Sequence, residues 1–241
     1  MTSILPIPDG VTLISGCYDG KICVWNTLKS KLLGTIQHHK ANVSGLRLLR
    51  CKTRFASASW DKTICIWKIG YRNISDKSTG IVSDRKIFEG CELEKIIDPN
   101  FKILSLNASI NRKNWIVFGG AINRVIIWDI DAGRLVKELE CENNNLTEIV
   151  LVEDESQEKM LIFGICEDDD VVRGWETDYQ DNEEFQTEAY NLKNRDKIYI
   201  NKAFGSGSVI QMIHEGRLRM AIANCSEEKH LVSLWELELG I

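Results

Sequence analysis

Three side chains in the first third of the chain have the types found in a Ser-His-Asp hydrolytic triad: His39, Ser57 and Asp61. In such a triad the serine attacks the substrate, the histidine takes its proton, and the aspartate orients the histidine. This chemistry needs an exposed serine beside donors that hold an oxyanion, and the sequence has no Gly-x-Ser-x-Gly motif that would supply that arrangement. We interpret the three residues as structural, because they belong to a repeat.

The segment from Ser57 to Trp67 repeats an earlier one, from Ser15 to Trp25. The two segments read SASWDKTICIW and SGCYDGKICVW, so serine, aspartate, cysteine and tryptophan recur at an interval of 42 residues. In each copy a hydrophobic stretch leads into a turn at the aspartate, and an alternation of β-branched residues then ends at the tryptophan. This pattern predicts two β-strands joined by a tight turn.

Three weaker copies follow, and we expect an all-β protein of five four-stranded units in a single domain, residues 1–241. The units extend over about residues 1–37, 38–90, 91–140, 141–190 and 191–241, and are marked by Trp25, Trp67, Trp128, Trp175 and Trp235. The expected strands are 3–6, 11–17, 21–25 and 32–37; 43–48, 55–59 and 63–67; 103–108, 115–121 and 124–128; 146–152, 160–166 and 171–175; and 208–213, 219–225 and 231–235. The tryptophans are spaced by 42, 61, 47 and 60 residues, so the longer intervals predict loop insertions.

The second unit resembles the repeats of the WD-repeat family of β-propellers. The residues that carry the resemblance are His39, Val43, Ser57, Asp61 and Trp67. The resemblance implies blades of four strands and about 40–45 residues. It also implies a hydrogen-bonded tetrad of histidine, strand serine, turn aspartate and tryptophan. The first unit has the corresponding Ser15, Asp19 and Trp25, for which the resemblance implies the same structural role.

Departures from the family pattern increase along the chain. His38 stands where a glycine is expected before the tetrad histidine, and the later units replace the serine or the aspartate of the tetrad. The substituted positions are Phe118 and Ile122 in the third unit, Ile165 in the fourth, which keeps Asp169, and Cys225 and Lys229 in the fifth. The tetrad is therefore expected in the first two units.

The two ends of the chain affect how a propeller would close. The first unit begins at its innermost strand and the last unit ends soon after Trp235, so neither end offers the outer strand that closes a propeller of this family. Natural proteins avoid bare strand edges or give them to a partner. We expect either two further blades upstream, giving seven, or completion by a partner. Five closed blades stay open as an alternative.

The composition is that of an ordinary globular protein, with 44% hydrophobic and 27% charged residues. No apolar run approaches the roughly 18 residues of a membrane-spanning helix, and Pro6, Pro8 and Asp9 interrupt the N-terminal apolar stretch, unlike a secretory signal. We therefore expect an intracellular location, cytoplasmic, nuclear or both. The eight cysteines include no CxxC pair and no Cys/His cluster, so we expect reduced thiols, no metal site and no cofactor.

Charge is unevenly distributed along the chain. Residues 1–90 hold 14 basic and 6 acidic residues, a balance of +8, whereas residues 91–241 hold 16 and 29, a balance of −13. Opposite fields suit two different partners, although solvated loops produce the same asymmetry. One basic cluster is a candidate phosphate contact: Arg47, Arg50, Lys52 and Arg54. It lacks interleaved aromatic residues, which favours a solvated turn. The acidic runs at 153–155 and 167–170 lack the spacing of a calcium loop.

Candidate partner-binding residues lie at the turns between the second and third strands, where the resemblance places the docking face of the family. Tyr18, Trp60 and Asp168 directly precede the turn aspartates, and Lys40 and Asn42 lie at the entry to an innermost strand. Exposed aromatic residues are typical interface anchors, although packing on neighbouring turns accounts for them equally well. The sequence predicts a non-catalytic scaffold that binds a protein or peptide in a larger complex. The alternative is a scaffold subunit of an RNA-binding or RNA-modifying complex.

Overall fold

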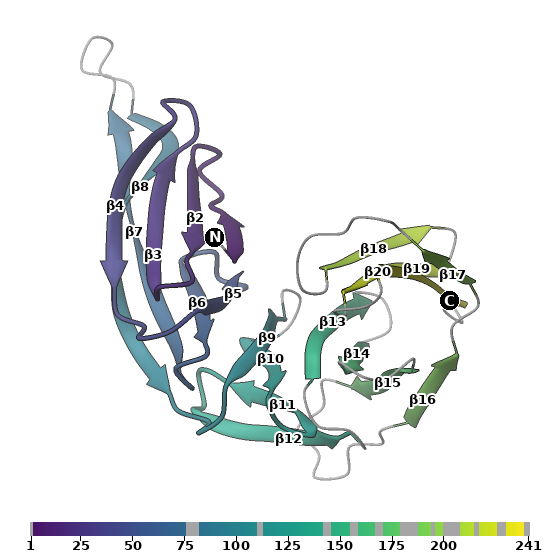
Figure 1. Ribbon diagram of the computed structural model, residues 1–241. Coiled ribbons are helices and arrows are strands. Elements are labelled where there is room, and N and C mark those ends of the chain that lie inside the picture. The colour runs from purple at the N-terminus through teal and green to yellow at the C-terminus, as the bar shows by residue number, and fades with distance from the viewer. Residues whose placement is uncertain are drawn as a thin grey trace. The chain divides into compact units, whose positions relative to one another are not determined.

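The structure is a computed structural model in which the regular elements are β-strands (Figure 1). It describes residues 2–75, 82–109, 113–141, 146–154, 159–166, 171–178, 188–193, 196–199, 208–214, 217–225 and 230–238. The strands form five four-stranded sheets, here called blades one to five in chain order, which confirms the predicted all-β fold. Two compact units are present: Met1–Ala121 with Ile126–Glu138, and Ile122–Val125 with Leu139–Ile241.

Blades one to three are up-and-down sheets in which the strand order follows the chain. Blade one contains β1 (Ser3–Pro6), β2 (Thr12–Gly16), β3 (Lys21–Asn26) and β4 (Lys31–Gln37). Blade two contains β5 (Val43–Leu48), β6 (Arg54–Ser59), β7 (Ile64–Ser75) and β8 (Val82–Ile97). Blade three contains β9 (Ile103–Ala108), β10 (Trp115–Gly120), β11 (Arg124–Asp129) and β12 (Arg134–Glu140). The first and last strands of each blade are therefore its edges.

Blades four and five differ in how they obtain their outer strand. Blade four follows the chain, with β13 (Leu146–Asp154), β14 (Lys159–Cys166), β15 (Val171–Asp178) and β16 (Glu188–Lys193). Blade five has the order β17-β20-β19-β18, with β17 (Asp196–Tyr199), β18 (Ser208–His214), β19 (Arg217–Cys225) and β20 (His230–Glu238). The outer strand β17 precedes β18 in sequence and pairs antiparallel with β20. No strand was predicted at residues 196–199, and β17 gives blade five an outer strand that comes before its innermost strand in the sequence.

The long interval between Trp67 and Trp128 contains strand rather than loop. β7 and β8 are 12 and 16 residues long, whereas the matching β3 and β4 of blade one have 6 and 7. The pair forms the long ribbon at the left of Figure 1, and Gly70 lies opposite Gly90 within it. The expected unit boundary near residue 90 consequently falls inside β8. Side chains of the ribbon, including Ile69 and Tyr71, extend the apolar core between blades one and two.

Apolar faces of neighbouring blades pack against each other to form the core of the first unit. One cluster joins blades one and two and includes Ile14, Val24, Phe55 and Trp67, and a second joins blades two and three. These residues come from the alternating strand patterns, so each blade buries one set of side chains toward each neighbour. Burial of such faces supplies the main stabilisation, at about 25 cal/mol for each Å² of apolar surface.

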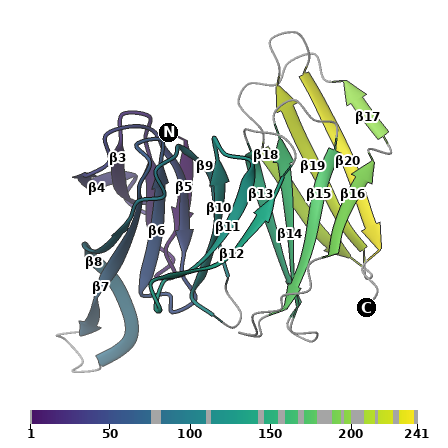
Figure 2. The ribbon, with the colours of Figure 1, turned by 90° about the horizontal axis from the view of Figure 1, so that it is seen from below.

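The innermost strands are held together by short side chains as well as by apolar packing. The Ser44 hydroxyl of β5 donates a 2.6 Å hydrogen bond to the Ile103 carbonyl at the start of β9, and these two strands lie side by side (Figure 2). Gly45 allows this close approach, because a Cβ atom there would lie 2.9 Å from the Cβ of Leu106. The inner strands and the turns beside them are therefore fixed relative to one another within the first unit.

Candidate functional site

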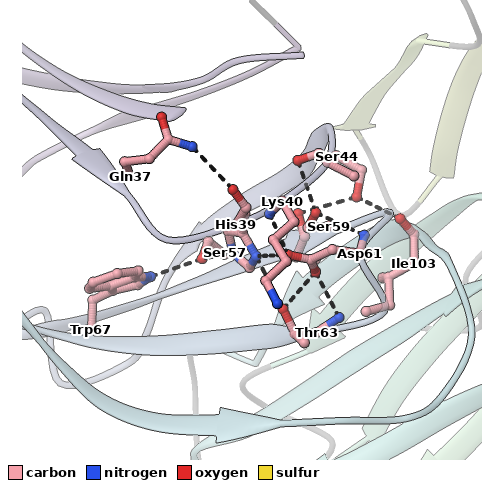
Figure 3. A network of polar contacts seen from close by, with 12 residues as sticks. Gln37, His39, Lys40, Ser44, Ser57, Ser59, Asp61, Thr63, Trp67 and Ile103 are labelled. Carbon is pink, nitrogen blue, oxygen red and sulfur yellow. Dashed lines mark hydrogen bonds and ion pairs between the residues drawn. The ribbon is translucent and has the colours of Figure 1, made fainter. Parts of the chain in front are cut away.

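A network of polar side chains lies between the entry to β5 and the β6–β7 turn, and is centred on His39 (Figure 3). The His39 Nδ1 atom lies 3.0 Å from Oδ2 of Asp61, and its Nε2 atom lies 2.8 Å from Oγ of Ser57. The indole N–H of Trp67 donates to the same Ser57 oxygen at 2.8 Å. The structure thus brings together the four residues of the expected tetrad in blade two.

The directions of these hydrogen bonds can be assigned from the partners. Since Ser57 accepts from Trp67, its hydroxyl proton is free to be donated to His39 Nε2, and His39 Nδ1–H then donates to Asp61. Asp61 also accepts from the Lys40 N–H at 2.9 Å and from the Thr63 N–H at 3.0 Å. The Thr63 hydroxyl donates a 2.6 Å hydrogen bond to Asp61. The repeat pattern does not indicate this contact, because the matching residue of blade one is Lys21.

Burial separates this network from a hydrolytic triad. Ser57 has no exposed surface and His39 is 1% exposed, so a substrate carbonyl cannot reach the serine oxygen. That oxygen is also engaged by two neighbours, the His39 ring and the Trp67 indole. The arrangement orients the turn after β6 and the entry to β5, and it has no exposed nucleophile with which to perform acyl transfer.

The electrostatics keep His39 neutral and Asp61 ionised. Burial of the His39 ring lowers the pKa of this histidine, and this effect outweighs the opposing influence of the Asp61 charge. Burial acts to raise the pKa of Asp61, but hydrogen bonds from the Thr63 hydroxyl and the Lys40 N–H, together with His39, lower it to about 2. A neutral imidazole that donates to a carboxylate is the form that satisfies every partner in the network.

Other blades hold only parts of the network. In blade one Trp25 donates to Ser15 at 2.9 Å, whereas Asp19 accepts from the backbone and ammonium of Lys21. In blade three Phe118 occupies the serine position, and the buried indole nitrogen of Trp128 has no hydrogen-bond partner among the described residues. Asp169 and Lys229 lie outside the described residues. Within the described part of the chain, blade two alone has the complete network.

A pair of aromatic residues, the exposed Tyr18 and the half-buried Trp60, lies beside this network. Tyr18, in the turn after β2, is 68% exposed, and its ring meets the ring of Trp60 edge to face at a centroid distance of 5.9 Å. The backbone N–H of Trp60 donates to the backbone carbonyl of Asn42, which connects the β6–β7 turn to the entry of β5. The two aromatic residues therefore pack on each other and still leave a large apolar surface in contact with solvent. We call Tyr18, Trp60, Lys40 and Lys62 the turn face.

The remaining candidates for partner binding have different environments. Lys40 is exposed, whereas Asn42 is 7% exposed, and its Oδ1 atom has no hydrogen-bond partner in the described part of the chain. Asp168 lies outside the described residues. Lys62, which the sequence analysis did not single out, is exposed and has a φ of 76°. The matching residue of blade one is Gly20, with a φ of 85°, so a lysine occupies a glycine-favouring conformation at a cost of about 1 kcal/mol.

The basic cluster does not form one continuous surface. The Arg47 Nε atom donates to Asn107 of β9 at 2.8 Å, and Arg54 forms ion pairs with Glu94 at 3.2 Å and Asp131 at 2.8 Å. Arg50 and Lys52 lie on the exposed β5–β6 turn. Arg47 and Arg54 are thus engaged by neighbouring side chains, which reduces the basic charge available to a nucleic acid.

The described residues contain no group of three or more His, Cys, Asp or Glu side chains that could hold a metal ion. None of the cysteines whose side chains are described forms a disulfide, namely Cys17, Cys23, Cys51, Cys65, Cys91 and Cys141. Burial raises the pKa of Cys65 to about 12 and that of Cys91 to about 11, so neither is a ready nucleophile. Within the described ranges there is no helix with the length and apolar character needed to cross a membrane.

Comparison with known proteins supports the assignment of the fold and of the His39 network to a WD-repeat β-propeller. The family model of the WD domain, G-beta repeat (WD40), matches residues 1–26 and 30–68, which hold the two aspartate turns and the His39 network. Solved WD40 structures share the fold. The crystal structure of RRP9 WD40 repeats has a TM-score of 0.59 at 15% identity, and the match covers 92% of this chain and 58% of that one. These matches identify WD repeats within residues 1–68, and the fold of the chain is that of WD-repeat β-propellers.

Two sequence relatives match short parts of the chain, and a chain from a solved complex shares its fold. DDB1- and CUL4-associated factor 13 of Mus musculus is 38% identical over 58 residues, covering 24% of this chain and 13% of that protein. Periodic tryptophan protein 2 of Saccharomyces cerevisiae is 36% identical over 78 residues, covering 32% and 8%. A chain in the crystal structure of the mitotic checkpoint complex has a TM-score of 0.55 at 15% identity, with 93% of this chain and 60% of that chain covered. The matches thus span less than a fifth of the two sequence relatives.

Proposed function

We propose that this protein is a non-catalytic scaffold subunit that binds a protein or peptide partner through the turn face. The observation that carries the proposal is the aromatic pair of the exposed Tyr18 and the half-buried Trp60. Two aromatic rings in contact with each other lose little further freedom when a partner covers them, and aromatic residues dominate the energetics of many interfaces. Scaffold function is also in keeping with WD40 proteins that are named for complexes.

The network supports the proposal by holding the turn face in place. Asp61 follows Trp60 directly and is bound by His39, Lys40 and Thr63, while the Trp60 backbone is bound to Asn42. A turn fixed by this many bonds presents its side chains in one arrangement, which reduces the entropy lost on binding. The intracellular location and the completion of the propeller by upstream blades or by a partner stay predictions.

Affinity purification followed by mass spectrometry tests the proposal. The tagged wild-type protein is compared with the double variant Tyr18→Ala, Trp60→Ala, and with a control that reverses Arg50 and Lys52 to glutamate on the β5–β6 turn. We expect a defined set of proteins with the wild type and the control, and loss of at least one of them with the aromatic variant. An unchanged set with the aromatic variant would move the binding surface elsewhere.

The alternative, a scaffold of an RNA-associated complex, depends on the basic cluster. Its clearest sign would be RNA binding that weakens steeply with salt and disappears when Arg50 and Lys52 are reversed. Since Arg47 and Arg54 contact Asn107, Glu94 and Asp131, we expect this cluster to contribute little to RNA binding.

A further inference from the structure

The turn face carries positive charge that neighbouring acids do not neutralise. Lys40 and Lys62 are both exposed, and the structure assigns no ion pair to either among the residues it describes. Asp19 pairs with Lys21 at 2.6 Å, whereas the ionised Asp61, beside the neutral His39 ring, offsets one of the two lysine charges and leaves a net positive charge on the turn face. Lys62 follows Trp60 by two residues, and the Lys40 N–H donates to Asp61 next to Trp60, so both lysines lie on the segments that hold this ring.

The backbone conformation of Lys62 gives a second indication that this lysine contacts a ligand. The left-handed backbone at this position favours glycine, which blade one has at Gly20. A lysine here strains the turn, and its exposed side chain makes no described contact that would compensate for the strain. Backbone strain of this kind is found at binding sites and also in turns such as that of Lys52, whose φ is 56°. At Lys62 it coincides with the aromatic pair.

We propose, building on the proposed function, that the partner of the turn face is an acidic peptide segment with an apolar anchor. The apolar residue packs on the Tyr18–Trp60 pair, and carboxylates beside it lie against Lys40 and Lys62. Two lysines match a short acidic segment. A nucleic-acid strand carries one charge for each nucleotide and needs a continuous basic track, which the turn face does not have.

A selection from phage-displayed random peptides of 16 residues tests the chemistry of the partner directly. The library is selected on the immobilised wild-type protein after depletion on the Tyr18→Ala, Trp60→Ala variant, so that recovered peptides need the aromatic pair. We expect peptides enriched in aspartate and glutamate around one large apolar residue. Recovery of neutral or basic peptides would overturn the inference and leave the proposed function intact, whereas no enrichment would contradict both.

The contribution of the two lysines is then measured by fluorescence anisotropy with the most enriched peptide. We expect Lys40→Ala and Lys62→Gly each to weaken binding about three- to fivefold, with the difference shrinking at high salt. Lys62→Gly should also raise the denaturation midpoint, which separates lost binding from lost folding. Lys29→Ala, an exposed lysine at the opposite end of β3, is the matched control and should bind as the wild type does.

Charge reversal completes the test. The double variant Lys40→Glu, Lys62→Glu should lose the acidic peptide and bind the same sequence with its acids changed to lysine. Equal affinity of the acidic peptide for wild type, Lys62→Gly and the reversed variant would overturn the inference. Tighter binding of a twelve-residue uridine RNA than of the acidic peptide, dependent on Lys40 and Lys62, would overturn it in favour of a nucleic acid.

Discussion

The Nδ1 atom of His39 lies 3.0 Å from Oδ2 of Asp61, although 22 residues separate the two in sequence. This contact joins the entry of the innermost strand of blade two to the turn that holds the half-buried Trp60 and the exposed Lys62. The same network passes through Ser57 to the buried Trp67. The stability of blade two and the geometry of the turn face are consequently linked.

Replacement of Asp61 by alanine should lower the free energy of unfolding by about 1–3 kcal/mol, because the His39 ring and the N–H groups of Lys40 and Thr63 lose their acceptor. Urea unfolding followed by circular dichroism measures this change. Asp19→Ala, at the matching exposed position of blade one, is the control and should have a clearly smaller effect, because its ion pair with Lys21 is screened by solvent. Equal losses in the two variants would contradict the role assigned to the network.

Acidification should destabilise the protein in two steps. The pKa of His39 is lowered by folding, so its contribution is present at neutral pH and is lost as pH falls below the ordinary histidine value of 6.5. The pKa of Asp61 falls from 3.8 to about 2, so its contribution is lost between about pH 4 and 2. Thermal unfolding between pH 8 and 5 should show the first step, and His39→Gln should reduce it, while His38→Gln should not.

Alanine substitution at two glycines distinguishes the effect of close packing on stability from the effect of backbone flexibility. Gly45→Ala should destabilise the protein by about 1–3 kcal/mol, because the new Cβ would lie 2.9 Å from Leu106 Cβ across the interface of blades two and three. Gly34→Ala in β4 meets no atom within 4 Å and should be neutral or stabilising by up to about 1 kcal/mol. Neither glycine has a positive φ, so comparison of the two denaturation midpoints isolates packing between the blades.

The strands of the first blades could be predicted because their side chains alternate. The stretch Val43–Leu48 was expected as a strand and is β5 without change, and the turns at Asp19 and Asp61 occur where the sequence places them. The extension of β7 and β8 could not be predicted in this way. It depends on pairing between segments such as Tyr71 and Phe88, which carry no strict alternation and resemble a loop insertion.

The candidate site was predictable only in part, for a related reason. The types and spacing of His39, Ser57, Asp61 and Trp67 identify the network, since all four belong to one repeat unit. Contacts between blades leave no such signal: the Tyr18–Trp60 ring contact and the Arg47–Asn107 hydrogen bond each join different blades. The replacement of Gly20 by Lys62 between the two repeats was a visible signal, and its meaning depended on the left-handed backbone at both positions.

The most direct test of the turn face as the docking surface is the dissociation rate of a purified partner recovered with the wild-type protein. Surface-binding measurements on the Tyr18→Ala, Trp60→Ala variant should show dissociation accelerated by at least about tenfold, with an unchanged circular dichroism spectrum. The Arg50→Glu, Lys52→Glu control should dissociate at the wild-type rate. A wild-type dissociation rate in the folded aromatic variant, or acceleration only in the Arg50→Glu, Lys52→Glu protein, would contradict this account.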